Sequence, residues 1–247
     1  MKPIILATAF AVTATAACLT VADESASANQ GRQILEQSAA AIKKLDRIAY
    51  DVEYHGTAWV VEHVPAIQGR VVVGKQSKHE ITEFFCDVTL KSQDSEQALK
   101  ITAGSDGDQF FLIDPETKKA HLDMDPAVLG SQGRNVQRVV LDVLAAEKPY
   151  AEDLEAETIT HEGTESIDGH DCHKIRVVRE SPPEMIYFLS KSDLLPRRVV
   201  RQFKGRDGEP GTTELTLAKL TPNPNEPKNP FKLQVPEGFQ KTDDFAP

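Results

Sequence analysis

The residue types most suited to chemistry gather in the segment Gly169-His170-Asp171-Cys172-His173. Imidazole, thiolate and carboxylate groups ligate transition metals, and a thiol beside an imidazole can act as a nucleophile. If the segment is a strand, His170 and Cys172 share one face and His173 lies on the other. A metal site would then need ligands from other segments, and a Cys172 nucleophile would need His161 across the hairpin. We therefore expect a turn and the start of a strand, with no metal.

Other catalytic signatures are missing from the sequence. It has no Gly-x-Ser-x-Gly segment, no Walker-type phosphate loop and no His-Glu-x-x-His motif. Asp51 and Glu53 alternate with apolar residues, which predicts the polar face of a strand, where carboxylates are usually solvated. We predict that the protein is not an enzyme and uses no cofactor. Catalysis by the segment from His170 to His173 is the alternative.

The charge of the chain bears on its partners. The formal net charge is −10 at pH 7, which opposes binding to a phosphate backbone, so no nucleic-acid partner is expected. Four basic residues cluster at Arg197, Arg198, Arg201 and Lys204. We interpret them as the solvated side of an edge or outer strand. Docking of a partner or of an anionic headgroup is the alternative.

The first residues have the pattern of an export signal. Lys2 precedes an apolar stretch from Pro3 to Ala17, and no acidic residue occurs before Asp23. A cationic start, a short apolar run and small residues before a processing site are typical of a secretory signal. The run is too short and too rich in Ala and Thr to predict a membrane span. The segment Ala26-Ser27-Ala28 favours cleavage after Ala28, with Ala22 as another site.

The three cysteines leave two alternatives open. Thr15-Ala16-Ala17-Cys18 is like a bacterial lipobox, although Thr15 stands where leucine is usual. Cys18 is therefore either removed with the signal or lipidated, and membrane contact is expected only if it is lipidated. Cys86 and Cys172 form a disulfide in an oxidising compartment or remain as two thiols in strands. The location is periplasmic or secreted, or alternatively lipid-anchored in the cell envelope.

Apolar residues at helical spacing predict two helices, at 30–45 and 134–147. The second carries a full apolar stripe of Val136, Val139, Val140, Val143 and Leu144. Because valine is not a strong helix former, packing must hold this helix. The Pro149 that follows ends it.

Alternating apolar and polar residues predict strands through most of the remaining chain. They are expected at 48–54 with an extension at Trp59-Val60-Val61, and at 71–73, 84–91, 99–101, 110–113, 120–124, 158–167, 170–179, 185–189, 194–203 and 212–220. Asp168-Gly169 is a hairpin turn. The short spacing argues for a single, strongly curved antiparallel sheet rather than βαβ units. The proline-rich segment from Thr221 onward should lie over the surface, anchored by Phe231 and Phe239.

A curved sheet has one concave face, which the two helices either fill or cap. If they fill it only partly, a pocket remains for an apolar ligand. An ordinary packed core is the alternative. The residues expected to line the cavity are apolar strand residues: Tyr50, Val52, Trp59, Val73, Phe84, Val88, Phe110, Leu112, Ile175, Val177 and Leu215.

The order of these elements resembles the LolA/LolB-like superfamily of periplasmic lipoprotein carriers, which includes outer-membrane lipoprotein-sorting proteins and RseB-type sensors. The resemblance rests on the helix at 30–45 followed by IAYDVEYHG, on GTESIDGHDCHKIRVV, on LPRRVVRQF and on the closing NPFKLQVPEGFQ. It implies an α+β, mostly β fold, in which an unclosed antiparallel half-barrel has two helices lidding its concave face. It also implies binding of lipoprotein acyl chains or related lipids, and no catalytic residues.

We therefore divide the chain into a signal peptide at 1–28, a LolA-like half-barrel domain at 29–220 and a proline-rich tail at 221–247 packed on that domain. The predicted function is non-enzymatic: an envelope protein that binds a lipid or a lipoprotein acyl chain in the half-barrel cavity. The alternative is a structural or sensing envelope protein with a protein partner and no lipid cargo.

Overall fold

The computed structural model describes residues 17–77, 81–92, 97–205, 207–225 and 229–246. Most of the predicted signal peptide therefore lies outside the described residues. Residues 17–28 form the beginning of the first helix. The side chain of Cys18, the residue that would be lipidated, is also outside the description. The division into signal peptide, half-barrel domain and tail stays a prediction.

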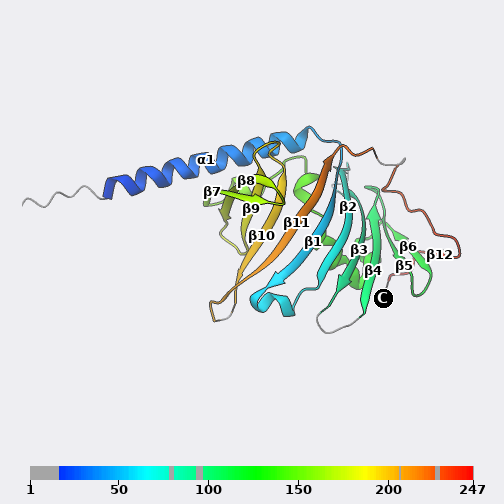
Figure 1. The fold of residues 1–247 in the computed structure, drawn as a ribbon. Helices are drawn as coiled ribbons and strands as arrows, with labels where there is room; N and C mark the ends of the chain where they lie inside the picture. Colours follow the sequence, from blue (N-terminus) through cyan, green and yellow to red (C-terminus); the bar gives the residue numbers. More distant parts are fainter. Residues whose placement is uncertain (1–16, 78–80, 93–96, 206, 226–228, 247) are drawn as a thin grey trace, which may run out of the picture.

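A single twelve-stranded sheet dominates the molecule (Figure 1). Its strands, in spatial order, are β12 (Gln240–Thr242), β6 (Lys119–Asp123), β5 (Phe110–Asp114), β4 (Ala98–Ser105), β3 (Thr82–Lys91), β2 (Ala66–Gln76), β1 (Ile48–Thr57), β11 (Pro210–Pro222), β10 (Pro196–Lys204), β9 (Glu184–Ser190), β8 (His170–Val178) and β7 (Thr158–Ile167). Neighbouring strands are antiparallel except β12 and β6, which are parallel. Strands β12 and β7 are the two free ends of the sheet, so the predicted unclosed, mostly antiparallel sheet is confirmed.

The strand register separates an apolar concave face from a more polar convex face. Tyr50 lies opposite Val71, Val71 opposite Cys86, and Cys86 opposite Ala103. All four are fully buried and belong to the main core cluster. Side chains of a strand alternate between faces, so this one register places the apolar half of each strand on the concave side.

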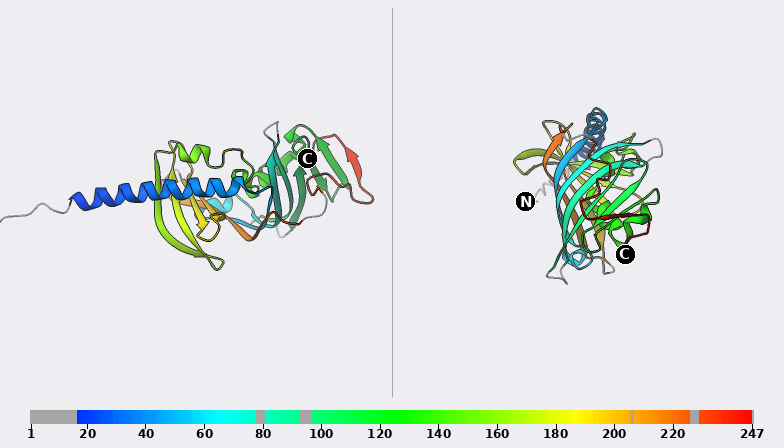
Figure 2. Two further views of the ribbon diagram at one scale, coloured as in Figure 1. Left: turned by 90° about the horizontal axis from the view of Figure 1, so that it is seen from above. Right: turned by 90° about the vertical axis from the view of Figure 1, so that its right-hand side faces the viewer.

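The helical segments are α1 (Ala17–Lys43), η1 (Ala58–Glu62), η2 (Pro126–Gln132), α2 (Gly133–Val139), η3 (Asp142–Leu144) and α3 (Ala151–Leu154). Helix α1 lies against β7, and η2 to η3 lie on the concave side of the curled sheet (Figure 2). The predicted helix at 30–45 is confirmed, and the structure extends it toward the N-terminus.

Two local predictions are wrong. The expected single helix at 134–147 breaks after Val139, because Val140 has an extended backbone (φ −83°, ψ 115°) and a short 3₁₀ turn follows. β-Branched valines disfavour a long helix, and tertiary contacts decide the backbone here. The expected strand at Trp59-Val60-Val61 is the 3₁₀ turn η1, which begins at Ala58 with φ 50°.

The proline-rich tail wraps across the convex face. Phe231 is buried against Ala49 and Val72, whereas Phe239 is half-buried. Beyond it, β12 adds to the edge of the sheet beside β6, and the backbone N–H of Ala246 donates to the Val128 carbonyl oxygen. The tail thus passes from the convex face around the sheet edge to the concave side.

Candidate ligand-binding site

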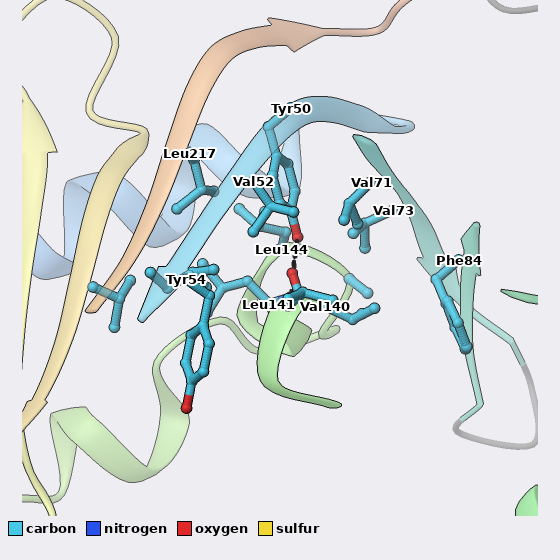
Figure 3. Close-up of a cluster of buried hydrophobic side chains, with 14 of the residues drawn as sticks. Tyr50, Val52, Tyr54, Val71, Val73, Phe84, Val140, Leu141, Leu144 and Leu217 are labelled. Atoms are coloured by element: carbon cyan, nitrogen blue, oxygen red, sulfur yellow. Dashed lines mark hydrogen bonds between the residues drawn. The ribbon is translucent and has the colours of Figure 1, made fainter. Parts of the chain in front are cut away.

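The chain segment from η2 to η3 fills the middle of the concave face. Its apolar residues Val128, Leu129, Val136, Val139, Val140, Leu141 and Leu144 pack against the strand residues of the main core cluster. Figure 3 shows Val140, Leu141 and Leu144 facing Tyr50, Val52 and Val71. Most of the concavity is therefore occupied by the protein's own side chains.

A tyrosine of the sheet fixes the break in this segment. The Tyr50 hydroxyl donates to the Val139 carbonyl oxygen at 2.7 Å and accepts from the backbone N–H of Leu141 at 3.2 Å. Both backbone groups belong to buried residues, and the break in the helix leaves them without regular partners. Burial also raises the pKa of the Tyr50 hydroxyl far above its ordinary value of 10.0, so the group stays protonated and able to donate.

The structure brings ten of the eleven predicted lining residues to the concave face. They are Tyr50, Val52, Val73, Phe84, Val88, Phe110, Leu112, Ile175, Val177 and Leu215, all in or against the main core cluster. Trp59 is not with them. It lies on η1, where its indole N–H donates to the Glu209 carbonyl oxygen, beside Gly205 and Gly211. Whether the ten bind a ligand stays a prediction.

A cavity with a volume of about 390 Å³ is open on the concave side. The sheet contributes Phe84 and Phe110, together with Ile81 and Thr82 at the start of β3. The helical segments contribute Leu129, Val136 and Val140. Of the predicted lining residues, only Phe84 and Phe110 reach this cavity. The helix side of the wall was absent from the predicted set, although the apolar stripe at Val136 and Val140 was visible in the sequence.

The polar groups of this cavity are few, and those from the described part of the chain include no base. Gln76, Thr82, Gln137 and Asp142 contribute to its lining. Loss of hydration raises the pKa of the Asp142 carboxyl, and the Arg201 guanidinium opposes that rise. A wall that is mostly apolar, with one acid and no Lys or Arg among its described residues, suits an uncharged chain better than an anion.

A buried polar network closes the other end of the concave face. The hydroxyls of Ser38 and Tyr150 lie 3.1 Å apart, and the Tyr187 hydroxyl donates to Asp153 Oδ2 at 2.7 Å. Arg179 Nε donates to Asp153 Oδ1 at 2.9 Å. Asp153 is only 3% exposed, and this pairing supplies the partners that a buried carboxylate needs. Helix α1, helix α3 and strands β8 and β9 are thereby held together.

The side chains of the His-Cys segment are divided between the two faces of strand β8. Cys172 lies on the convex face in a small cluster with Ile186 and Phe188, and its thiol donates to the His170 carbonyl oxygen. His173 lies on the opposite face, where its Nδ1 is 3.2 Å from Nε2 of His161. The pairing of Cys172 with His161 that a nucleophile would require is therefore not formed. No group of three or more metal-ligating side chains converges within the described residues.

The disulfide alternative for Cys86 and Cys172 is wrong. Both thiols are free and buried. Cys86 belongs to the concave core and Cys172 to the convex cluster. Five strands lie between β3 and β8 in the sheet, so the two sulfur atoms are separated by both distance and face.

The basic cluster on β10 is divided between environments. Strand β10 lies between β9 and β11, not at an edge. Arg197 is buried and pairs with Asp193 at 2.6 Å, whereas Arg198 lies over the Phe188 ring and Lys204 pairs with Glu184 at 3.7 Å. The interpretation as a solvated outer strand is therefore wrong, and the four residues form no common docking patch.

Comparison with known proteins agrees with this fold. The structure resembles LprF from Mycobacterium bovis, with 11% identity, a TM-score of 0.51, and coverage of 86% of this chain and 98% of LprF. It also resembles MucB, with 7% identity, a TM-score of 0.53, and coverage of 84% of this chain and 64% of MucB. These likenesses confirm the predicted half-barrel fold. No curated protein matches the chain in sequence.

Two further observations concern location. Within the described part of the chain, no helix is both long enough and apolar enough to span a bilayer. A family model described as "Predicted periplasmic protein (DUF2092)" matches residues 93–243. The match covers more than half of the chain, and the description confirms the predicted envelope location. The chain belongs to this DUF2092 family of predicted periplasmic proteins.

Proposed function

We propose that the protein binds the acyl chain of an envelope lipid or lipoprotein in the concave cavity. The observation that carries this proposal is the 390 Å³ cavity between α2 and strands β3 and β5, with an apolar wall of Phe84, Phe110, Leu129 and Val136. Its size falls within the range of about 300–1,000 Å³ that is usual for ligand pockets. Each CH₂ group buried there contributes about 0.8 kcal/mol, so part of one acyl chain would bind in water.

The lining of the cavity favours an uncharged part of the ligand. A carboxylate or phosphate would meet the Asp142 carboxyl, and no base lies among the described lining residues. An acyl chain attached through an ester or amide presents no charge along its length. The headgroup or protein part of the ligand would then remain in solvent at the mouth, beside Gln137.

A single substitution at the mouth tests the proposal. Gln137 is exposed on α2 and lines the cavity, so Gln137→Trp should fill the opening without disturbing the core. Arg134→Trp is the matched control, because Arg134 is exposed on the same helix and does not line the cavity. Binding of the neutral probe N-phenyl-1-naphthylamine is followed by fluorescence. We expect tight binding by the native protein and by R134W, and at least tenfold weaker binding by Q137W.

A folded native protein that takes up no probe and carries no lipid in native mass spectrometry would contradict the proposal. That outcome would favour the second candidate, a structural or sensing envelope protein with a protein partner. One observation supports the second candidate: the segment from η2 to η3 fills most of the concave face with the protein's own side chains. In that case, chemical cross-linking in intact cells would capture one dominant protein.

A further inference from the structure

A second cavity of similar size lies on the opposite, convex face of the sheet. Its volume is about 380 Å³. The floor consists of the convex-facing side chains of Val72, Phe85, Phe111 and Ile113, which come from strands β2, β3 and β5. The roof consists of Pro230, Lys232 and Gln234 of the tail. This convex pocket is therefore built between the sheet and the tail.

Glycines of the strands make room for the aromatic rings that shape this pocket. A Cβ atom on Gly74 would come within 2.9 Å of the Phe231 ring, and one on Gly104 within 2.5 Å of the Phe111 ring. Neither ring could keep its place beside a larger residue. Phe231 thus packs closely against the sheet, with the Arg47 guanidinium 5.8 Å from the ring centroid.

The tail is fixed on both sides of the convex pocket. Phe231 is buried at one side, and at the other side β12 pairs with β6 from Gln240 to Thr242. The segment between these two anchors crosses the convex face of the sheet and covers the pocket. The roof of the pocket is consequently a built feature of the fold rather than a loose end of the chain.

The charges of the convex pocket are opposite to those of the concave cavity. Arg70 and Lys232 line it, and among the lining residues that the structure describes none is acidic. Lys232 is exposed and forms no ion pair within the described residues. Arg70 lies between two acidic residues of the neighbouring strands, Asp51 at 3.7 Å and its register partner Asp87. Each of these acids also pairs with a lysine, Asp51 with Lys219 at 2.8 Å and Asp87 with Lys100 at 3.2 Å, and all five side chains are more than one-third exposed, so neither acid neutralises Arg70 fully. In a chain of net charge −10, an apolar pocket with two bases is locally complementary to an anion.

We propose that the convex pocket binds a single-chain fatty acid, with its alkyl chain over Phe85, Phe111 and Ile113 and its carboxylate at Arg70 and Lys232. The size suits a medium chain, because about 380 Å³ lies near the lower end of ligand pockets. The site differs in face, charge and ligand class from the concave cavity, and it stands whether or not that cavity binds an acyl chain.

The test compares two probes of equal chain length, dodecanoate and dodecanol, by isothermal titration calorimetry on the full-length mature protein at pH 8. Both probes are used below the concentration at which dodecanoate forms micelles. The native protein should bind dodecanoate more tightly. Lys232→Gln should weaken dodecanoate binding by about threefold to tenfold, the range for loss of one partly exposed charge contact, and leave dodecanol binding unchanged. Lys204→Gln is the matched control, since it removes an exposed lysine on the same convex face at β10.

A filling substitution separates this pocket from the concave one. Ile113 is half-buried on the pocket floor, and Ile113→Trp should abolish dodecanoate binding while leaving N-phenyl-1-naphthylamine binding unchanged. Gln137→Trp should show the reverse pattern. Equal affinity of the native protein for the two probes, equal effects of K232Q and K204Q, or full dodecanoate binding by a folded I113W protein would each overturn the proposal.

Discussion

The hydroxyl of Tyr50 donates to the carbonyl oxygen of Val139 at 2.7 Å and fastens the end of helix α2 to the floor of the half-barrel. The Tyr50 hydroxyl oxygen also accepts a hydrogen bond from the backbone N–H of Leu141. One side chain of the sheet thereby satisfies both backbone groups that the broken helix exposes. The break is needed because it turns the chain so that Val140, Leu141 and Leu144 can all be buried.

Removal of this hydroxyl should cost stability without a loss of packing volume. Tyr50→Phe would leave two buried backbone groups unsatisfied, and we expect the free energy of unfolding to fall by about 1–3 kcal/mol. Tyr54→Phe is the control: Tyr54 lies on the same face of β1 (Figure 3), and its hydroxyl has no partner within the described residues. Urea unfolding measures both. Equal stability of the two variants would contradict the assigned role of Tyr50.

Anchoring of the tail depends on Phe231. Phe231 is 4% exposed, whereas Phe245 in the same tail is 60% exposed. Phe231→Ala should lower the free energy of unfolding by about 3 kcal/mol, because a large buried ring is lost, and should make the tail a target for limited proteolysis. Phe245→Ala should change stability by less than about 0.5 kcal/mol. Equal rates of tail cleavage in the two variants would argue against the anchor.

The strand pattern of this sequence was readable because one face of the sheet is buried. Alternation at Tyr50, Val52 and Tyr54 fixed both the strand and the face that its residues occupy. The helix at 30–45 was predictable for the same reason, since its apolar residues recur at helical spacing. Ten of the eleven predicted lining residues consequently lie on the concave face.

The features that escaped prediction depend on contacts between distant residues. The break at Val140 requires the Tyr50 hydroxyl, which lies about ninety residues earlier in the chain. Trp59 continued an apolar run but follows Ala58, whose positive φ turns the chain away from the sheet. The convex pocket could not be predicted, because it exists only where the tail returns over Gly74 and Gly104.

Phe84 and Trp59 were both predicted to line the cavity, but their positions in the structure predict opposite effects of their removal on ligand binding. Phe84 lines the concave cavity, and Trp59 does not. Phe84→Ala should weaken binding of N-phenyl-1-naphthylamine by about tenfold. That change corresponds to a loss of about 1.4 kcal/mol, which is part of the free energy that a phenyl ring contributes through apolar contact. Trp59→Ala should leave the affinity unchanged. Fluorescence titration of both proteins, after a check of their folding by circular dichroism, decides the matter, and a larger effect at Trp59 would place the ligand elsewhere.

The two cysteines should behave as buried thiols. Burial raises the pKa of the Cys86 thiol to about 12 and also raises that of Cys172, and a protonated, buried thiol reacts slowly. The folded mature protein should not react with Ellman's reagent at pH 8. After unfolding in guanidinium chloride without reductant, two thiols per chain should react. Recovery of no thiol would reinstate the disulfide.

Stability should depend on pH through the histidine pair on β7 and β8. Burial, followed by the charges of His161 and Lys191, lowers the pKa of His173 below its ordinary value of 6.5. The unfolded chain then binds a proton at a higher pH than the folded chain, so the free energy of unfolding falls as the pH drops through about 6.5 toward the lowered pKa. Above this window the contribution is absent, because both states are neutral.

His173→Gln should reduce the loss of stability between pH 7 and pH 5, measured by urea unfolding, because it removes the group whose pKa differs between the folded and unfolded chains. His55→Gln is the control, since His55 is exposed on the convex face of β1 and contacts Glu214 at 3.9 Å. A pH dependence that is unchanged in H173Q would show that other groups govern it.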